Sequence, residues 1–137
     1  MSGASTSEAL VLDASALVET LLGTEVGTYV RKRMRGCRLH APAHVDAEVL
    51  SALGRMWRAD DLSESTVLEA LAQLAVAPIQ RHPLSSLLAG AWARRDSQRL
   101  VDAIYLELAD SLGQARLVST DARLARSHDG VELVTLE

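Results

Sequence analysis

The chain has 137 residues, which is the size of one domain, and 48% of them are hydrophobic, which excludes extensive disorder. A net charge of −4 and an aromatic content of 3% exclude a globally basic nucleic-acid binder and a base-stacking single-strand-binding module. The single cysteine, Cys37, excludes an intrachain disulfide, and no apolar stretch is long enough to span a membrane. We therefore expect a cytoplasmic protein with one domain over residues 9–137. Residues 1–8 lack the features of a signal peptide and are expected to form a flexible N-terminal tail.

Short apolar runs alternate with helical patterns along the chain. The first run, residues 9–12, predicts a buried strand that ends at Asp13. Ser15 is the expected cap of the next helix, Gly23 ends that helix, and Pro42 is expected to open the helix after the second strand. In order, the predicted elements are strand 9–12, helix 16–22, helix 24–35, strand 38–41, helix 43–59, a helix beginning at Ser63, strand 79–82, helix 84–95, helix 101–112, strand 116–118, helix 121–127 and strand 131–136.

This alternation predicts an α/β fold with a central parallel sheet of about five short strands, flanked by helices on both faces. Apolar residues at helical spacing define the inward face of the helices. In the helix from Ser63 the predicted inward residues are Val67, Leu68, Leu71 and Leu74, and in helix 101–112 they are Val101, Ile104, Tyr105, Leu108 and Leu112.

Two carboxylates directly follow predicted strands. Asp13 comes after the first strand, and Asp121 comes after the fourth, beyond Ser119 and Thr120. Ligands of open α/β sheets bind outside the carboxyl ends of the strands, so both side chains stand where a site is expected. An aspartate at a strand end is also a common helix cap, and position alone does not separate the two roles.

Two helices add further acidic candidates. Asp102 lies inside or beside the apolar face of helix 101–112, where a carboxylate is costly unless it is paired, protonated or bound to a cation. Helix 43–59 carries Asp46 and Glu48, and a helical wheel does not choose between them. Histidine and cysteine spacing fits no zinc site, and no phosphate-binding glycine loop or nucleophile elbow is present.

Arginine supplies most of the basic charge and occurs in two clusters. Lys32 is the only lysine of the chain. The planar guanidinium suits phosphate, but a solvated helix face explains such clusters equally well. The first cluster comprises Arg31, Lys32, Arg33, Arg35 and Arg38, and the second comprises Arg94, Arg95 and Arg99.

Four segments, taken together, resemble a PIN domain, and specifically a VapC-like ribonuclease toxin of a toxin–antitoxin pair. The first is LVLDASALV at 10–18, which has a strand, an acidic residue and a serine two positions later. The second is Pro42 followed by EVLSAL at 48–53, and the resemblance selects Glu48 over Asp46. The others are VDAIYLELA at 101–109 and LVSTDARLA at 117–125. Ser51 departs from the asparagine that is common at its position.

The resemblance implies an endoribonuclease that cuts RNA with the carboxylates of Asp13, Glu48, Asp102 and Asp121. Four such charges in one cleft repel unless they hold cations or share protons, and hard oxygen ligands suit Mg²⁺ or Mn²⁺. We expect Asp13, Asp102 and Asp121 to bind the metal, and Glu48 to bind a second metal or orient the attacking water. Ser15 and Thr120 are expected to support these ligands.

The resemblance also implies an RNA substrate, a homodimer and an antitoxin that blocks the cleft. Trp57 and Trp92 are candidates for partner contacts, although partly buried packing would explain them as well. One alternative is a catalytically inactive PIN-like module that binds RNA or protein. A second is a regulatory domain of the receiver type, but such a domain needs a lysine late in the chain, and Lys32 stands early.

Overall fold

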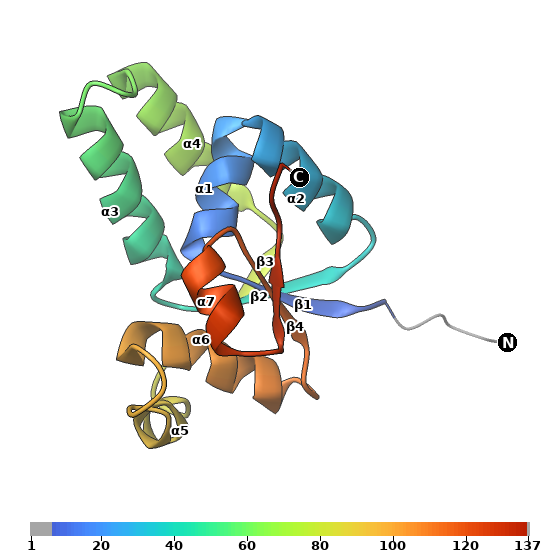
Figure 1. The fold of residues 1–137 in the computed structure, drawn as a ribbon. Helices are drawn as coiled ribbons and strands as arrows, with labels where there is room; N and C mark the ends of the chain where they lie inside the picture. Colours follow the sequence, from blue (N-terminus) through green and yellow to red (C-terminus); the bar gives the residue numbers. More distant parts are fainter. Residues whose placement is uncertain (1–6, 137) are drawn as a thin grey trace, which may run out of the picture.

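Five strands form a single parallel sheet in the computed structural model, which describes residues 7–136 (Figure 1). Their order across the sheet is β3-β2-β1-β4-β5, and each neighbouring pair is parallel. This arrangement confirms the predicted α/β class and strand number. The strands are β1 (Ala9–Leu12), β2 (Arg38–Pro42), β3 (Ile79–His82), β4 (Arg116–Ser119) and β5 (Val131–Leu133).

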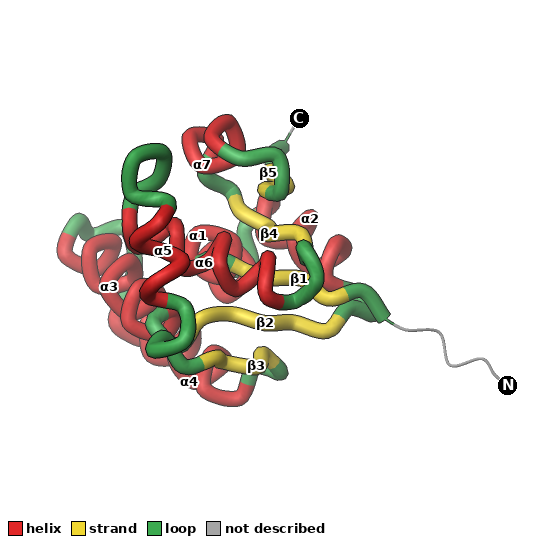
Figure 2. Tube along the Cα trace, turned by 90° about the horizontal axis from the view of Figure 1, so that it is seen from below, coloured by secondary structure: helices red, strands yellow, loops and turns green. Residues whose placement is uncertain are grey.

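Helices cover both faces of the sheet, as predicted. Helices α1 to α4 lie on one face, while α5 and α6 lie on the other (Figure 1). The view in Figure 2 shows α6 lying across the middle strands, and α6 contacts β1, β2 and β4. The helices are α1 (Ala14–Leu22), α2 (Glu25–Met34), α3 (Val45–Arg58), α4 (Glu64–Val76), α5 (Leu88–Ala93), α6 (Leu100–Ser111) and α7 (Ala122–Ser127).

The central strand β1 is buried on both faces. Leu10, Val11 and Leu12 are fully buried, as expected for a strand between two helical layers. Leu12 of β1 is in register with Val118 of β4, so the residues that follow these two strands emerge together at the carboxyl edge of the sheet. The register therefore brings Asp13 close to the segment that contains Asp121.

Two predicted helix starts are wrong. Asp13, rather than Ser15, caps α1, because its Oδ1 accepts the Ala16 N–H at 3.0 Å while the Ser15 hydroxyl donates to Asp13 instead. Pro42 does not open α3. It is the last residue of β2, where the lack of an N–H costs no hydrogen bond inside the sheet, and α3 begins at Val45.

The predicted helix at 84–95 is too long, because α5 spans only Leu88–Ala93. The residues after Pro83 form turns, and Leu88 points outward with 53% of its surface exposed. Leu68 of α4 is also exposed, at 58%, because the buried stripe of that helix runs through Ala70 and Leu74. Val101 is likewise more exposed than predicted, at 41%.

Several arginines of the two clusters form ion pairs within the fold. Arg33 pairs with Glu8 at 2.8 Å and with Glu132 of β5 at 2.5 Å, so α2 is tied to both ends of the chain. Arg94 pairs with Glu107 and Asp110 and thereby holds α5 against α6. The expected tail, residues 1–8, lies outside the described residues up to position 6. Across residues 7–136, no helix is long and apolar enough to cross a membrane.

Candidate active site

The four acidic residues singled out from the sequence come from four different elements near the carboxyl edge of the sheet. Asp13 directly follows β1, and Asp121 caps α7 after β4. Glu48 lies in the first turn of α3, and Asp102 lies in the first turn of α6. Their surroundings differ, and the differences determine what each can do.

Asp13 is the most buried of the four, with 7% of its surface exposed. Burial raises the pKa of its carboxyl, while hydrogen bonds from Ser119, Ser15 and the Ala16 N–H act in the opposite direction. The nearby charge of Asp121 raises this pKa further. A buried carboxylate held by neutral donors is suited to accept a cation, because no ion pair is assigned to Asp13 within residues 7–136.

Ser119 belongs to the site but was not predicted from the sequence. It is fully buried at the end of β4, and its hydroxyl donates to Asp13 Oδ2 at 2.5 Å. Ser119 Oγ also accepts the Asp121 N–H at 3.0 Å, so Ser119 links the two aspartates. A serine among small residues at a strand end gives no strong sequence signal beyond its place two residues before Asp121.

Ser15 and Thr120 complete this network. The Ser15 hydroxyl donates to Asp13 Oδ1 at 2.7 Å and accepts the Thr120 N–H at 3.0 Å. Thr120 therefore contributes its backbone N–H to the network, and the residue also lines the adjacent cleft. The segments after β1 and β4 are thus fixed to each other by side-chain hydrogen bonds.

Glu48 and Asp46, which the helical wheel could not separate, face different surroundings. Tyr105 donates its hydroxyl to Glu48 Oε1 at 2.5 Å, and His44 Nε2 lies 3.5 Å from the same oxygen. Burial and the bond to Glu48 raise the pKa of Tyr105, so the phenol remains a donor. Asp46 instead forms an ion pair with Arg81 of β3 at 2.9 Å.

Asp102 and Asp121 share one guanidinium. Arg123 Nη2 lies 2.8 Å from Asp102 Oδ2 and 3.2 Å from Asp121 Oδ2. Asp121 also caps α7 through the N–H groups of Arg123 and Leu124. Arg99 Nε approaches the same Asp102 oxygen at 4.0 Å. Arg123 was not predicted, although its place in the DAR sequence two residues after Asp121 is a local signal.

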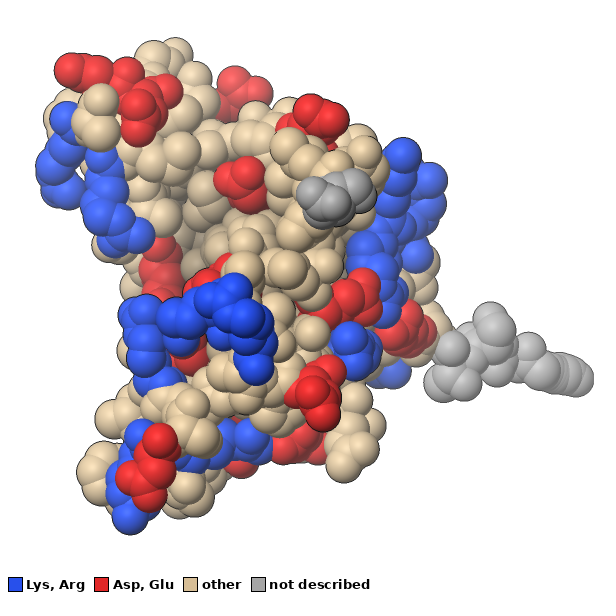
Figure 3. All heavy atoms as spheres, in the orientation of Figure 1, with Lys and Arg blue, Asp and Glu red and all other residues tan. Residues whose placement is uncertain are grey.

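A cleft of about 360 Å³ opens beside these groups, between α1, α3 and the β4–α7 connection. Glu48, Ser15 and Thr120 line it together with Arg55 of α3. In Figure 3, basic side chains gather over α3 and over α7, with acidic side chains visible between them. An acidic cleft with basic walls suits a polyanion that approaches a cation-binding centre.

The donor set fits a hard divalent cation, since carboxylate oxygens are the ligands that Mg²⁺ and Mn²⁺ prefer. The charged oxygens are not yet gathered around one point. Among residues 7–136, no three side chains of the His, Cys, Asp and Glu types lie close enough together to hold a metal ion. The guanidinium of Arg123 and the phenol of Tyr105 occupy carboxylate oxygens instead.

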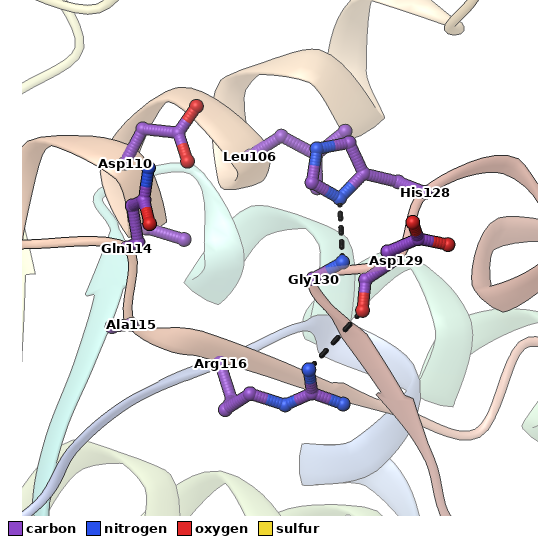
Figure 4. A pocket seen from close by; sticks show the side chains of 9 residues that line it. Leu106, Asp110, Gln114, Ala115, Arg116, His128, Asp129 and Gly130 are labelled. Carbon is purple, nitrogen blue, oxygen red and sulfur yellow. Dashed lines mark hydrogen bonds between the residues drawn. The ribbon is translucent and has the colours of Figure 1, made fainter.

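A second pocket, of about 430 Å³, lies away from these carboxylates (Figure 4). Its walls come from the end of α6, the start of β4 and the loop before β5. Arg116 donates there to the Asp129 carbonyl at 3.1 Å, and the Gly130 N–H donates to His128 Nδ1 at 2.8 Å. The polar groups of this pocket form hydrogen bonds within the loop before β5. We therefore place the functional site in the smaller cleft, beside the four acidic residues.

Known proteins resemble this chain along most of its length. The family model of the PIN domain matches residues 10–128. The chain is 54% identical to ribonuclease VapC3 of Mycobacterium tuberculosis over 121 residues, which cover 88% of each protein. It is 38% identical to ribonuclease VapC12 of the same organism over 119 residues, which cover 87% of this chain and 92% of that protein.

Solved structures share the fold. A structure of PAE2754 from Pyrobaculum aerophilum is similar with a TM-score of 0.65 and 26% identity, over 96% of this chain and 86% of that one. A toxin–antitoxin complex from Klebsiella pneumoniae is similar with a TM-score of 0.65 and 17% identity, over 90% and 95% of the two chains, which supports the fold alone. The chain belongs to the PIN-domain family and, within it, to the VapC ribonucleases.

Proposed function

We propose that the chain is the toxin of a toxin–antitoxin pair and cuts RNA at a centre that binds Mg²⁺ or Mn²⁺. Asp13, Asp102 and Asp121 would bind the ion. Ribonucleases of this family are in general metal-dependent, which supports a cation at the site. One observation supports this metal site above all. Asp13 is a buried carboxylate whose pKa is raised by burial and, in addition, by the nearby negative charge of Asp121.

The ion, when bound, lowers the pKa of the attacking water and neutralises charge on the scissile phosphate. The residues of the chain supply the geometry. Ser119 and Ser15 hold the Asp13 carboxylate in one orientation. Tyr105 and His44 both approach Glu48 Oε1, so we assign Glu48 Oε2 to the water. Since Glu48 lines the cleft, that oxygen can meet a water beside a phosphate bound there.

The relatives support one of the proposed partners, the antitoxin. One structural neighbour is a toxin–antitoxin complex, and we propose a cognate antitoxin that covers the cleft of this chain. We further propose a homodimer in the cytoplasm. Trp57 and Trp92 support partner contacts, because 49% and 57% of their surfaces are exposed in the single chain.

The test is cleavage of a mixed structured RNA pool by wild type, Glu48→Gln and Asp46→Asn with Mg²⁺, Mn²⁺ or EDTA. Both substitutions remove one acid from the first turn of α3, but only Glu48 faces the cleft. We expect wild type and Asp46→Asn to cut in a metal-dependent way and Glu48→Gln to be inactive. Equal cleavage by the two variants would refute the role of Glu48, and cleavage in EDTA would refute the metal mechanism.

A further inference from the structure

One guanidinium joins two partly buried carboxylates of the site. Arg123 Nη2 is within hydrogen-bond distance of both Asp102 Oδ2 and Asp121 Oδ2, which belong to α6 and to the cap of α7. The hydrogen bond to Asp102, above all, raises the pKa of Arg123, so its charge is permanent at neutral pH. The bridge therefore places one positive charge between two of the oxygens that the proposed function assigns to a metal.

The Arg123 guanidinium and a metal ion cannot both bind Asp102 Oδ2 and Asp121 Oδ2 at the same time. A carboxylate oxygen that ligates Mg²⁺ at about 2.0–2.1 Å brings that cation close to any guanidinium at hydrogen-bond distance, and like charges repel. The described residues hold no ready cluster of three metal-ligating side chains. The Arg123 side chain is 44% exposed, so it has room to swing away into solvent.

We propose that Arg123 is a resident counter-cation that competes with the divalent metal for Asp102 and Asp121 and leaves when the metal binds. The proposal rests on the proposed function, in which these two aspartates are metal ligands. In the metal-free protein Arg123 relieves the repulsion between the two acids, and Arg99, at 4.0 Å from Asp102 Oδ2, adds a weaker compensation on Asp102 alone. Its cost is a lower affinity for the metal, because binding has to break both ion pairs.

A matched pair of substitutions tests this competition. Arg123→Gln removes the bridging charge. Arg126→Gln removes the same charge three residues later in α7, from an exposed side chain to which no ion pair is assigned within residues 7–136. Mn²⁺ binding to the full chain, without RNA, is measured by electron paramagnetic resonance and by titration calorimetry. We expect Arg123→Gln to bind Mn²⁺ roughly fivefold to tenfold more tightly than wild type, because the ion then no longer has to break two partly exposed ion pairs.

The control Arg126→Gln should bind within about twofold of wild type, since long-range charge effects are screened. A merely structural role for Arg123 would predict weaker binding, because a loosened site loses its ligand geometry. Melting in EDTA shows whether Arg123→Gln folds, and Arg123→Met provides a second neutral variant if it does not. In the folded variant, Mn²⁺ should raise the melting temperature more than it does in wild type.

The outcomes separate the two proposals. Equal or weaker Mn²⁺ binding by Arg123→Gln, with wild type binding the ion and Asp102→Asn weakening it, would overturn the competition and leave the metal site standing. Absence of Mn²⁺ binding in wild type and in every variant would overturn the metal site and the competition together. Equal tightening by Arg123→Gln and Arg126→Gln would also overturn the competition, because net charge alone would then explain the effect.

Discussion

Replacement of Ser119 by alanine should destabilise the protein strongly, because the loss of one hydroxyl removes two hydrogen bonds. The hydroxyl is fully buried, donates to Asp13 and accepts the Asp121 N–H. A hydrogen bond to a charged group contributes about 1.5–3 kcal/mol, and a backbone N–H left without a partner costs about 1 kcal/mol more. The free energy of unfolding should therefore fall by roughly 2–4 kcal/mol, a large part of the roughly 5–15 kcal/mol of a typical domain.

The loss should depend on pH, because Ser119 lowers the pKa of Asp13 by stabilising the charged carboxylate. Without Ser119 the folded-state pKa of Asp13 rises further above its unfolded value. The full destabilisation is present where Asp13 is ionised in both proteins. It shrinks as the pH falls through the pKa of the variant and then through that of wild type, because a protonated Asp13 needs the donor less.

Urea unfolding at pH 7.5 and at about pH 5 measures both effects, with Ser111→Ala as the control. Ser111 donates to the Leu108 carbonyl at the exposed end of α6, so its loss should change the unfolding free energy by less than about 0.5 kcal/mol. A double-mutant cycle of Ser119→Ala with Asp13→Asn then isolates the coupling between the two side chains. Strict additivity in that cycle, or a Ser119→Ala variant as stable as Ser111→Ala, would show that the network does not hold Asp13.

Two further changes test the site, and a third, at His40 of β2, tests the stability of the sheet. Asp13→Asn should abolish cleavage yet raise the melting temperature at pH 7.5 by roughly 2–6 °C, because burial disfavours the charge that it removes; a lower melting temperature would contradict this. Tyr105→Phe should slow single-turnover cleavage about tenfold by freeing the Glu48 carboxylate, and an unchanged rate would exclude that positioning role. Burial, with His82 and Arg38 nearby, lowers the pKa of His40, so the unfolded state binds more protons and stability should fall as the pH drops below about 6.5. The melting temperatures of wild type and His40→Gln, measured between pH 7.5 and 5, should diverge below about pH 6.5. A constant difference across this range would show that the lowered pKa of His40 does not affect stability.

The fold was predictable because the spacing of hydrophobic residues identifies its strands and helices. Buried strands such as β1 are short continuous apolar runs, and a run of this kind between helices identifies a parallel sheet. The same logic placed Asp13 and Asp121 at the carboxyl edge. Helix boundaries were less predictable, as the 84–95 segment shows, because leucines at helical spacing fit a turn after Pro83 as well as a helix.

The helical wheel could not choose between Asp46 and Glu48, and only the family resemblance favoured Glu48. Both lie in the first turn of α3, and what separates them is a partner from elsewhere in the chain: Arg81 of β3 for Asp46, and Tyr105 of α6 for Glu48. Ser119 escaped detection for the same reason, since its role depends on the register between β1 and β4. Local patterns predict elements, but long-range pairs decide which polar side chain enters a site.

The partners of the carboxylates divide the site into a fixed and an exchangeable part. Neutral hydroxyls hold Asp13 and Glu48, and a neutral donor can stay in place while its carboxylate binds a cation. A guanidinium holds Asp102 and Asp121, and that charge has to move before a metal shares their oxygens. Asp13 should then set where the metal binds, whereas Asp102 and Asp121 should set how tightly it binds in competition with Arg123. Substitution of Ser119 should accordingly disturb the position of the ion, and substitution of Arg123 its affinity.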